Sequence, residues 1–222
     1  MFYWVMKHLI AGPLLRALLR PRLSGVSNIP RTGPVILASN HLSFIDPVIL
    51  PLVIRRRIHF LAASDYFAGR GLGGWAVARF LIATGMIPID RSGGRASEAS
   101  LAAGLGVLAR GEVLGIYPEG SRSRDGKLHR GRTGIARTIL NSGATVVPVA
   151  MIGTDEVIPV DSGSVRPHIR RIGIAFGPPL DFSGYAGGSD DGRVLRTITD
   201  QVMQAIHALS DQEYVDSYGA RR

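Results

Sequence analysis

The chain has 222 residues and 45% of them are hydrophobic, which suits one domain with a substantial apolar core. It contains no cysteine, which excludes disulfides, cysteine-based metal sites and a thiol nucleophile. Its formal net charge is +9, from 26 Lys and Arg against 17 Asp and Glu. That balance favours an anionic partner: nucleic acid, an acidic membrane surface or a phosphorylated substrate.

Residues 1–22 open the chain with an amphipathic helical segment. Aromatic side chains at positions 2–4 are followed by Leu and Ile residues, which Lys7, Arg16 and Arg20 interrupt. A membrane-spanning helix needs about 20 mainly apolar residues, so these charges disfavour a span. Aromatic residues combined with Arg and Lys are typical of a helix that lies in a membrane interface. We therefore predict a membrane-associating helix, with a terminal helix that covers the core as the alternative.

From residue 23 to residue 210, apolar strands alternate with helices. The predicted strands cover residues 34–39, 58–63, 86–91, 112–117, 145–152 and 169–176, and the predicted helices lie at 47–54, within 64–83, and at 95–110, 133–142 and 189–209. This alternation predicts an α/β fold with a mixed, largely parallel sheet flanked by helices. Pro148 should exclude its strand from an ordinary central position or mark a bulge. Residues 211–222 are polar, and we expect a mobile tail.

Charged side chains follow three of the predicted strands. They are His41 and Asp46 after the first, Asp90 and Arg91 after the third, and Glu119 and Arg122 after the fourth. Because loops at one edge of an α/β sheet converge, we expect these groups to share a pocket. A histidine that takes a proton, beside a carboxylate that orients it, is suited to proton transfer. Arginines suit a phosphate because they donate charge-assisted hydrogen bonds in pairs.

Each of these positions also has a purely structural interpretation. Asp46 followed by Pro47 is a good helix start, with Asp46 as the N-cap. Arg91 suits an ion pair with Asp90, and Glu119 suits a Pro-Glu-Gly turn. The chain has no Gly-x-Ser-x-Gly elbow, no Gly-x4-Gly-Lys-Ser/Thr loop and no His-Glu-x2-His motif. What remains is a histidine base without a protein nucleophile, which suits deprotonation of a substrate hydroxyl that attacks an activated acyl group, with no metal or cofactor.

Four motifs occur in order between residues 40 and 150. They are Asn40-His41-Leu42-Ser43-Phe44-Ile45-Asp46, Gly85-Met86-Ile87-Pro88-Ile89-Asp90-Arg91, Tyr117-Pro118-Glu119-Gly120-Ser121-Arg122-Ser123 and Val146-Val147-Pro148-Val149-Ala150. They resemble the motifs Asn-His-x4-Asp, Gly-x-Ile-x-Ile-x-Arg, Phe-Pro-Glu-Gly-Thr-Arg-Ser and an apolar strand with a central proline. These belong to the 1-acylglycerol-3-phosphate O-acyltransferase (lysophosphatidic acid acyltransferase) family of glycerolipid acyltransferases. The third motif is the most diagnostic.

The resemblance implies an α/β acyltransferase domain over residues 23–210 and a membrane-anchoring segment before it. His41 would be the general base and Asp46 its orienting partner. The substrate-binding residues implied are Arg91, Glu119, Gly120, Ser121 and Arg122 around the glycerol phosphate, and Pro148 on the acyl-chain side.

The resemblance also implies a reaction. A fatty acyl group would pass from acyl-CoA or acyl carrier protein to the sn-2 hydroxyl of 1-acylglycerol 3-phosphate, giving phosphatidic acid for phospholipid synthesis. The protein would lie on an anionic membrane surface at the cytoplasmic face of the cell membrane and bind no nucleic acid. Another acceptor is the alternative (another lysophospholipid, glycerol 3-phosphate or a glycolipid), because residues 62–65 lack the lysine common in relatives and Pro88 replaces an aromatic residue. A non-catalytic basic binding protein is a third interpretation, but it has no need of Glu119.

Overall fold

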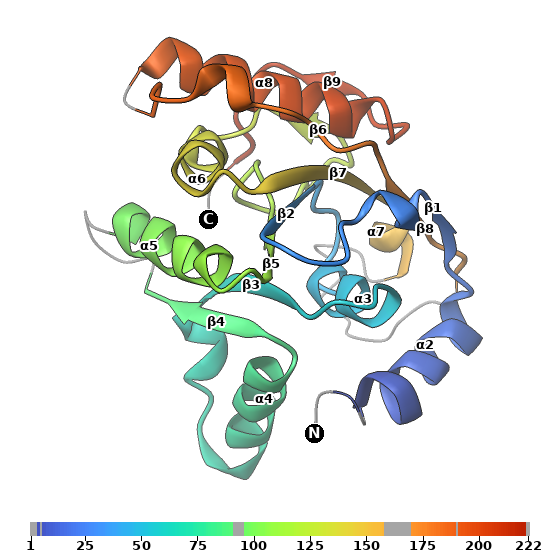
Figure 1. The fold of residues 1–222 in the computed structure, drawn as a ribbon. Coiled ribbons are helices and arrows are strands. Elements are labelled where there is room, and N and C mark those ends of the chain that lie inside the picture. Colours follow the sequence, from blue (N-terminus) through green and yellow to red (C-terminus); the bar gives the residue numbers. More distant parts are fainter. Residues whose placement is uncertain (1–3, 5, 91–95, 158–169, 190, 221–222) are drawn as a thin grey trace.

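The computed structural model describes residues 4, 6–90, 96–157, 170–189 and 191–220. In this part of the chain, one sheet has the strand order β1-β8-β7-β2-β5-β3-β4 (Figure 1). Its strands are β1 (Arg22–Ser24), β2 (Val35–Ser39), β3 (Ile58–Ala63), β4 (Met86–Ile89), β5 (Val113–Ile116), β7 (Thr145–Ile152) and β8 (Gly173–Phe176). Only the β7–β8 pair is antiparallel among these neighbours. The predicted α/β fold with a mixed, largely parallel sheet is therefore confirmed.

Helices cover both faces of the sheet (Figure 1). One face carries α2 (Ala11–Leu19), which follows the π-helical turn η1 (Met6–Ile10), and α3 (Asp46–Val53); the other carries α5 (Ala96–Ala109), α6 (Gly134–Ser142) and α8 (Gly192–His207). Helix α4 (Gly71–Ala83) follows η3 (Ser64–Phe67) and projects beside β4. The connections contain η2 (Val26–Asn28), α7 (Thr154–Val157) and η4 (Ser183–Tyr185).

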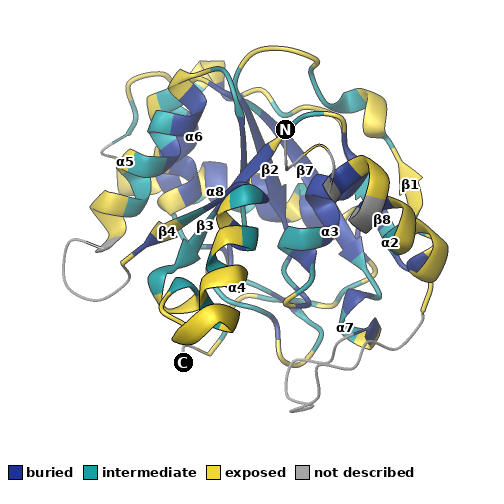
Figure 2. Cartoon of the chain, turned by 90° about the horizontal axis from the view of Figure 1, so that it is seen from below, coloured by how far each residue is buried: buried dark blue, intermediate teal, exposed yellow. Residues whose placement is uncertain are grey.

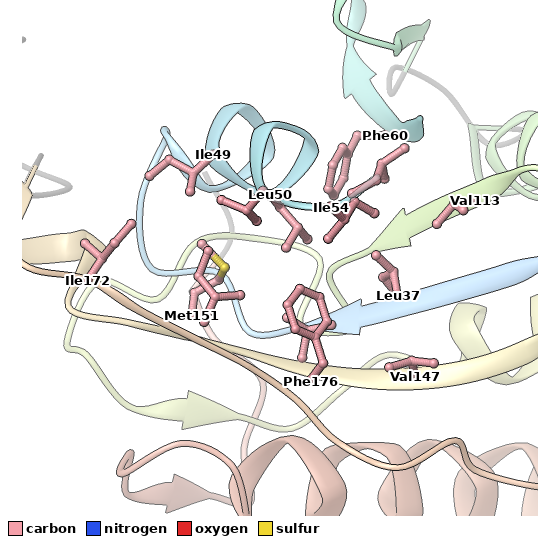
Figure 3. Close-up of a cluster of buried hydrophobic side chains, with 14 of the residues drawn as sticks. Leu37, Ile49, Leu50, Ile54, Phe60, Val113, Val147, Met151, Ile172 and Phe176 are labelled. Carbon is pink, nitrogen blue, oxygen red and sulfur yellow. The ribbon is translucent and has the colours of Figure 1, made fainter. Parts of the chain in front are cut away.

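Successive side chains of the central strands point to opposite faces of the sheet, so the apolar core has two parts. In β2, Val35 and Leu37 face α2 and α3, whereas Ile36 and Ala38 face α5, α6 and α8. All five residues of β2 are buried, which explains why its sequence is apolar without interruption. Figure 3 shows the first core, where side chains of α3 pack on those of the sheet. Each fully buried Leu or Ile contributes about 1.5–3 kcal/mol, so the strands that end at the site are firmly supported.

Pro148 lies in β7, an interior strand between β8 and β2, so the prediction that it excludes its strand from a central position is wrong. The backbone nitrogen and carbonyl oxygen of one strand residue point toward the same neighbouring strand. In Pro148 the carbonyl oxygen accepts from Gly177 N at 2.9 Å, just after β8. The missing N–H therefore faces the end of β8. Beyond it, Val146 bridges to Leu180, one residue out of the β7–β8 register. A bulge at Pro178-Pro179 thus lies opposite Val147, directly beside Pro148, which agrees with the second half of the prediction.

The C-terminal segment, predicted as a mobile tail, folds back over the domain. We call residues 211–220 the C-terminal strap. Within it, β9 (Tyr214–Val215) pairs in parallel with β6 (Leu128–His129). The ring of Tyr218 lies under the guanidinium group of Arg130, 5.7 Å from its centroid. Backbone pairing and a cation–π contact hold a segment whose polar composition gave no sign of either.

The predicted membrane-associating helix corresponds to η1 and α2. None of the helices in the described ranges is long and apolar enough to cross a membrane. Lys7 is buried, and its ammonium group donates to the carbonyl oxygen of Ile54 at the end of α3, which fixes η1 to the domain. Leu9 and Leu14 on the same segment are exposed. The membrane role of this segment stays a prediction.

Gly115 of β5 makes room for the ring of Phe60 on β3. A Cβ at position 115 would lie 2.2 Å from the Phe60 Cε1 atom. Gly115→Ala should therefore lower the free energy of unfolding by about 1–3 kcal/mol, because overpacking forces the neighbours to shift. Urea unfolding measures the loss. Gly134→Ala in α6, where an added Cβ meets nothing within 4 Å, is the matched control and should be neutral or stabilising. Equal losses in both variants would contradict the steric explanation.

Candidate active site

His41 and Asp46 lie in the connection from β2 to the first turn of α3. His41 Nδ1–H donates to Asp46 Oδ2 over 2.9 Å. The same oxygen accepts from the backbone N–H groups of Leu42 and Ser43, at 2.8 Å each. Asp46 is fully buried, whereas the His41 side chain keeps 15% of its surface exposed. The carboxylate therefore fixes the ring orientation and the Nδ1–H tautomer, which leaves Nε2 as the nitrogen that accepts a proton.

Asp46 begins α3 but does not cap it. Its carboxylate accepts from the loop that precedes the helix, and no side chain caps the start of α3. The N-cap interpretation is therefore wrong. Pro47 does stand in the first turn, as its fixed φ favours. The helix start thus directs the Asp46 carboxylate backward, toward His41.

The imidazole ring of His41 is held by stacking as well as by hydrogen bonding. It stacks on Tyr117 with 3.9 Å between ring centroids and 12° between planes. Tyr117 stacks in turn on Phe60 at 5.4 Å, in the space that Gly115 leaves. Burial, and secondarily the charge of Asp46, raises the pKa of Tyr117 well above its ordinary value, so its hydroxyl stays protonated. One face of the imidazole is covered, and substrates must approach from the other side or from the ring edge.

Glu119 points inward from a tight turn. Gly120 closes this turn with a φ of 79°, a conformation that glycine adopts without strain, and its N–H donates to Tyr117 O at 3.0 Å. Glu119 Oε1 accepts from His41 N at 3.4 Å and Oε2 accepts from His129 N at 2.9 Å. Burial raises the pKa of Glu119 to about 7. Both oxygens accept backbone donors, so Glu119 joins the His41 loop to the loop that follows β5, while its binding of phosphate stays a prediction.

A pocket of about 180 Å³ lies in the loop that follows β5. The predicted residues Glu119, Ser121 and Arg122 line it, together with the unpredicted residues Ser123, Arg124, Asp125 and His129 and with Gly219 and Ala220 of the C-terminal strap. His129 pairs with Asp125 through a 3.0 Å contact between Nε2 and Oδ1. The sequence did contain a signal for Arg124, because residues 120–137 hold six Lys and Arg against one acidic residue. Two arginines in one pocket suit the oxygens of a phosphate group.

Of the described residues predicted to bind substrate, Gly120 and Pro148 are not among those that line this pocket. Arg91 lies outside the described residues, after the edge strand β4. Three strand spacings separate β4 from β2, roughly 14 Å, so the three strand ends do not meet as immediate neighbours. Pro148 is buried in β7 next to β2, on the sheet face that Val146 shares. Its role on the acyl-chain side stays a prediction.

Asn40 ties the end of β2 to two other segments. Its Oδ1 accepts from Met151 N at 2.7 Å, and its Nδ2 donates to Met151 O at 2.9 Å and to Gln212 Oε1 at 2.6 Å. Gln212 Nε2 donates in turn to Gly126 O at 2.8 Å. The C-terminal strap thereby joins the His41 loop to the loop that lines the pocket. Sequence reasoning missed Gln212, which lies 172 residues from Asn40.

No three His, Asp or Glu side chains form a metal-binding group within the part of the chain that the structure describes. The sequence-based expectation that no metal or cofactor takes part stays a prediction.

The family model described as Acyltransferase matches residues 20–152, which is more than half of the chain. The chain belongs to this family. A chloroplastic 1-acyl-sn-glycerol-3-phosphate acyltransferase of Arabidopsis thaliana is 29% identical over 147 residues, 66% of this chain but 40% of the relative. The 1-acyl-sn-glycerol-3-phosphate acyltransferase of Bacillus subtilis is 27% identical over 187 residues, 83% of this chain and 85% of the relative. The chain thus spans less than half the length of the plant relative.

The crystal structure of the 1-acyl-sn-glycerophosphate (LPA) acyltransferase PlsC from Thermotoga maritima superposes with a TM-score of 0.67 and 24% identity, over 89% of this chain and 76% of that one. This likeness shows the shared fold. The range matched by the acyltransferase family model contains His41, Asp46, Glu119, Arg122 and Pro148. The family resemblance inferred from the motifs is confirmed, and the roles of the individual residues stay predictions.

The burial of Glu119 should make the stability of the protein depend on pH. Its pKa rises from 4.5 to about 7 on folding, so the folded protein binds one more proton between these values. The free energy of unfolding should therefore fall as the pH rises from about 4.5 to about 7. Glu119→Gln removes the titrating group. Urea unfolding at about pH 5 and about pH 8 should show a larger loss of stability for the wild type than for this variant, and equal losses would contradict the prediction.

Gln212→Ala should loosen the C-terminal strap, because it removes the link between Asn40 and Gly126. We expect a loss of about 1–2 kcal/mol in the free energy of unfolding. The backbone N–H of Leu128, which donates to Glu213 O at 2.9 Å, should exchange with solvent faster. Gln201→Ala is the matched control, since Gln201 is exposed and donates to Tyr185 Oη. Unchanged exchange at Leu128 would show that Gln212 does not hold the strap.

Proposed function

We propose that this chain is an O-acyltransferase that moves a fatty acyl group from acyl-CoA or acyl carrier protein to the sn-2 hydroxyl of 1-acylglycerol 3-phosphate, giving phosphatidic acid. The observation that carries the proposal is the bond from His41 Nδ1–H to Asp46 Oδ2, close to the arginine-lined pocket. The names of the relatives in Arabidopsis thaliana and Bacillus subtilis support the acceptor.

The reaction needs a base that works directly on the acceptor. His41 Nε2 takes the proton of the acceptor hydroxyl as its oxygen attacks the thioester carbonyl carbon. The negative charge of Asp46 stabilises the imidazolium that forms. The C–S bond then breaks, the new ester remains on the acceptor, and the imidazolium returns its proton to the departing thiolate. General-base catalysis of this kind contributes about 10²–10⁴-fold, and positioning of the two substrates adds to it.

Charge orients the acceptor in this proposal. Arg122, Arg124 and Ser121, which line the pocket, bind the phosphate group. The backbone at Gly120, next to Ser121 in the chain, contacts a phosphate oxygen. Glu119 positions these groups, because its two oxygens join the His41 loop to the loop that lines the pocket. A step that uses only a thioester and a general base has no need of a metal or cofactor.

We further propose that the protein works on an anionic membrane surface, at the cytoplasmic face of the cell membrane.

Removal of the proposed base should slow turnover strongly. His41→Ala should lower kcat by roughly 10²–10⁴-fold. Asp46→Asn should also lower kcat by roughly 10²-fold or more, because a neutral amide stabilises the imidazolium poorly and can hold the wrong tautomer. Asn is preferred to Ala at position 46, since its oxygen still accepts from the loop N–H groups. The assay follows transfer from labelled acyl-CoA to 1-acylglycerol 3-phosphate, with thermal unfolding as the check on folding.

His207→Ala is the matched control, because His207 is exposed on α8. Full activity of the His41 variant would contradict the mechanism, and an inactive wild type would favour a non-catalytic membrane-binding protein. Full activity of the Asp46 variant would limit that residue to a structural role. A panel of lysophospholipids, glycerol 3-phosphate and glycolipids in the same assay separates the proposed acceptor from the alternatives.

A further inference from the structure

Helix α4 is apolar on most sides yet lies largely outside the core. Leu81 is its one buried residue. Leu72 is 87% exposed and Trp75 is 64% exposed, and the side chains of Val77 and Ile82 also face outward. A helix that is hydrophobic all round is normally buried in a globular protein, and an exposed apolar patch marks a binding surface.

The exposed apolar surface continues from α4 to the His41 loop. Tyr66 of η3 and Phe44 are both exposed, and their ring centroids lie 5.9 Å apart. Phe44 stands three residues after His41, within the loop that ends at Asp46. The surface therefore reaches the loop that carries the proposed base.

The N-terminal helix lies on the same side of the molecule. Figure 2 shows α2 and α4 with α3 between them, and both helices are largely exposed. Trp4, Leu9, Leu14 and Leu18 are exposed on the N-terminal segment. We call the exposed sides of residues 4, 6–19 and 64–83 the apolar face.

Basic side chains border the apolar face. Arg16, Arg70 and Arg79 are exposed, the N-terminal segment has no acidic residue, and Asp65 is the one carboxylate within residues 64–83. Aromatic and aliphatic side chains beside arginines fit an anionic lipid surface, where the cations meet phosphates and the apolar groups enter the boundary of the acyl chains. A second copy of this chain would bring like charges together, which disfavours a dimer across this face.

We propose that α4 is a second membrane-insertion element beside the N-terminal helix, so that the apolar face rests on the anionic bilayer that the proposed function assigns to the protein. Phe44 and Tyr66 then stand between the bilayer and His41, so that a lipid acceptor reaches the base without leaving the apolar phase. The docking needs only the apolar face, whereas this path for the acceptor rests on the proposed acyltransferase function.

The two tryptophans test the proposal, because the chain has only Trp4 and Trp75. Trp4→Phe leaves Trp75 as the sole fluorophore on α4, and Trp75→Phe leaves Trp4. Each variant is mixed with vesicles of phosphatidylglycerol and phosphatidylcholine whose acyl chains are brominated. Trp75 should shift to shorter wavelength and be quenched. A protein that sediments with the vesicles while Trp75 stays unquenched would overturn the role of α4, and a wild type that fails to bind would overturn the docking.

Leu72→Ser combined with Val77→Ser tests the same face by affinity. The double variant should bind these vesicles at least tenfold more weakly, because two exposed apolar side chains no longer enter the lipid. Leu23→Ser on β1 is the matched control, since Leu23 is also exposed but lies outside the apolar face. Equal affinity of the double variant and the control would contradict the proposal. Dimerisation of the wild type without lipid, lost in the double variant, would assign the face to a second copy.

A water-soluble, short-chain acceptor and a short-chain acyl thioester separate docking from catalysis. The double variant should turn over these monomeric substrates at the wild-type rate and lose activity only on vesicles. Loss of activity on the monomeric substrates would show that α4 supports the site itself and would overturn a pure docking role. If the wild type transfers no acyl group but Trp75 is still quenched, the proposed acyltransferase function fails while the docking stands.

Discussion

One buried oxygen atom organises the site. Asp46 Oδ2 accepts from the imidazole of His41 and from two consecutive backbone N–H groups, all at 2.8–2.9 Å. These donors offset part of the cost of burying the carboxylate, whose Oδ1 has no hydrogen-bond partner among the described residues. Two of the donors belong to the backbone, whose geometry the loop fixes. A single side chain thus sets the loop, the start of α3 and the direction of the ring. A substitution of Asp46 should therefore alter the loop, the start of α3 and the orientation of the His41 ring together.

A second buried carboxylate extends this arrangement to the neighbouring strand. Glu119 accepts backbone N–H groups from His41 and His129, and Ser123 N donates to His41 O at 2.8 Å. Strands β2 and β5 are adjacent and parallel, so their following loops lie within hydrogen-bonding reach. The proposed base and the pocket therefore form one unit, built mainly from bonds to the backbone. Such a site keeps its geometry before any substrate binds, which favours catalysis by positioning.

Largely apolar runs in the sequence predict β3 and β7 at their observed bounds, because strands covered on both faces carry nearly continuous apolar residues; His59 is the exception within β3. They do not predict β1, β6 or β9, which are short and depend on distant partners. At the site, motif spacing identifies His41, Asp46 and Glu119. The inward direction of Glu119 and the bond from Asn40 to Gln212 arise between residues 78 and 172 positions apart, and no local pattern contains them.

The C-terminal strap should make the site less resistant to heat and denaturant than the sheet. It is held by a two-residue strand pair, by Gln212 and by exposed ion pairs such as Lys127 with Glu213, which contribute little. Segments of this kind open at a lower free energy than the whole domain. When the strap opens, Asn40 loses one partner and the pocket loses its Gly219 wall, while β2 and β7 remain paired. We therefore expect the pocket to lose its shape at a lower temperature than the sheet unfolds.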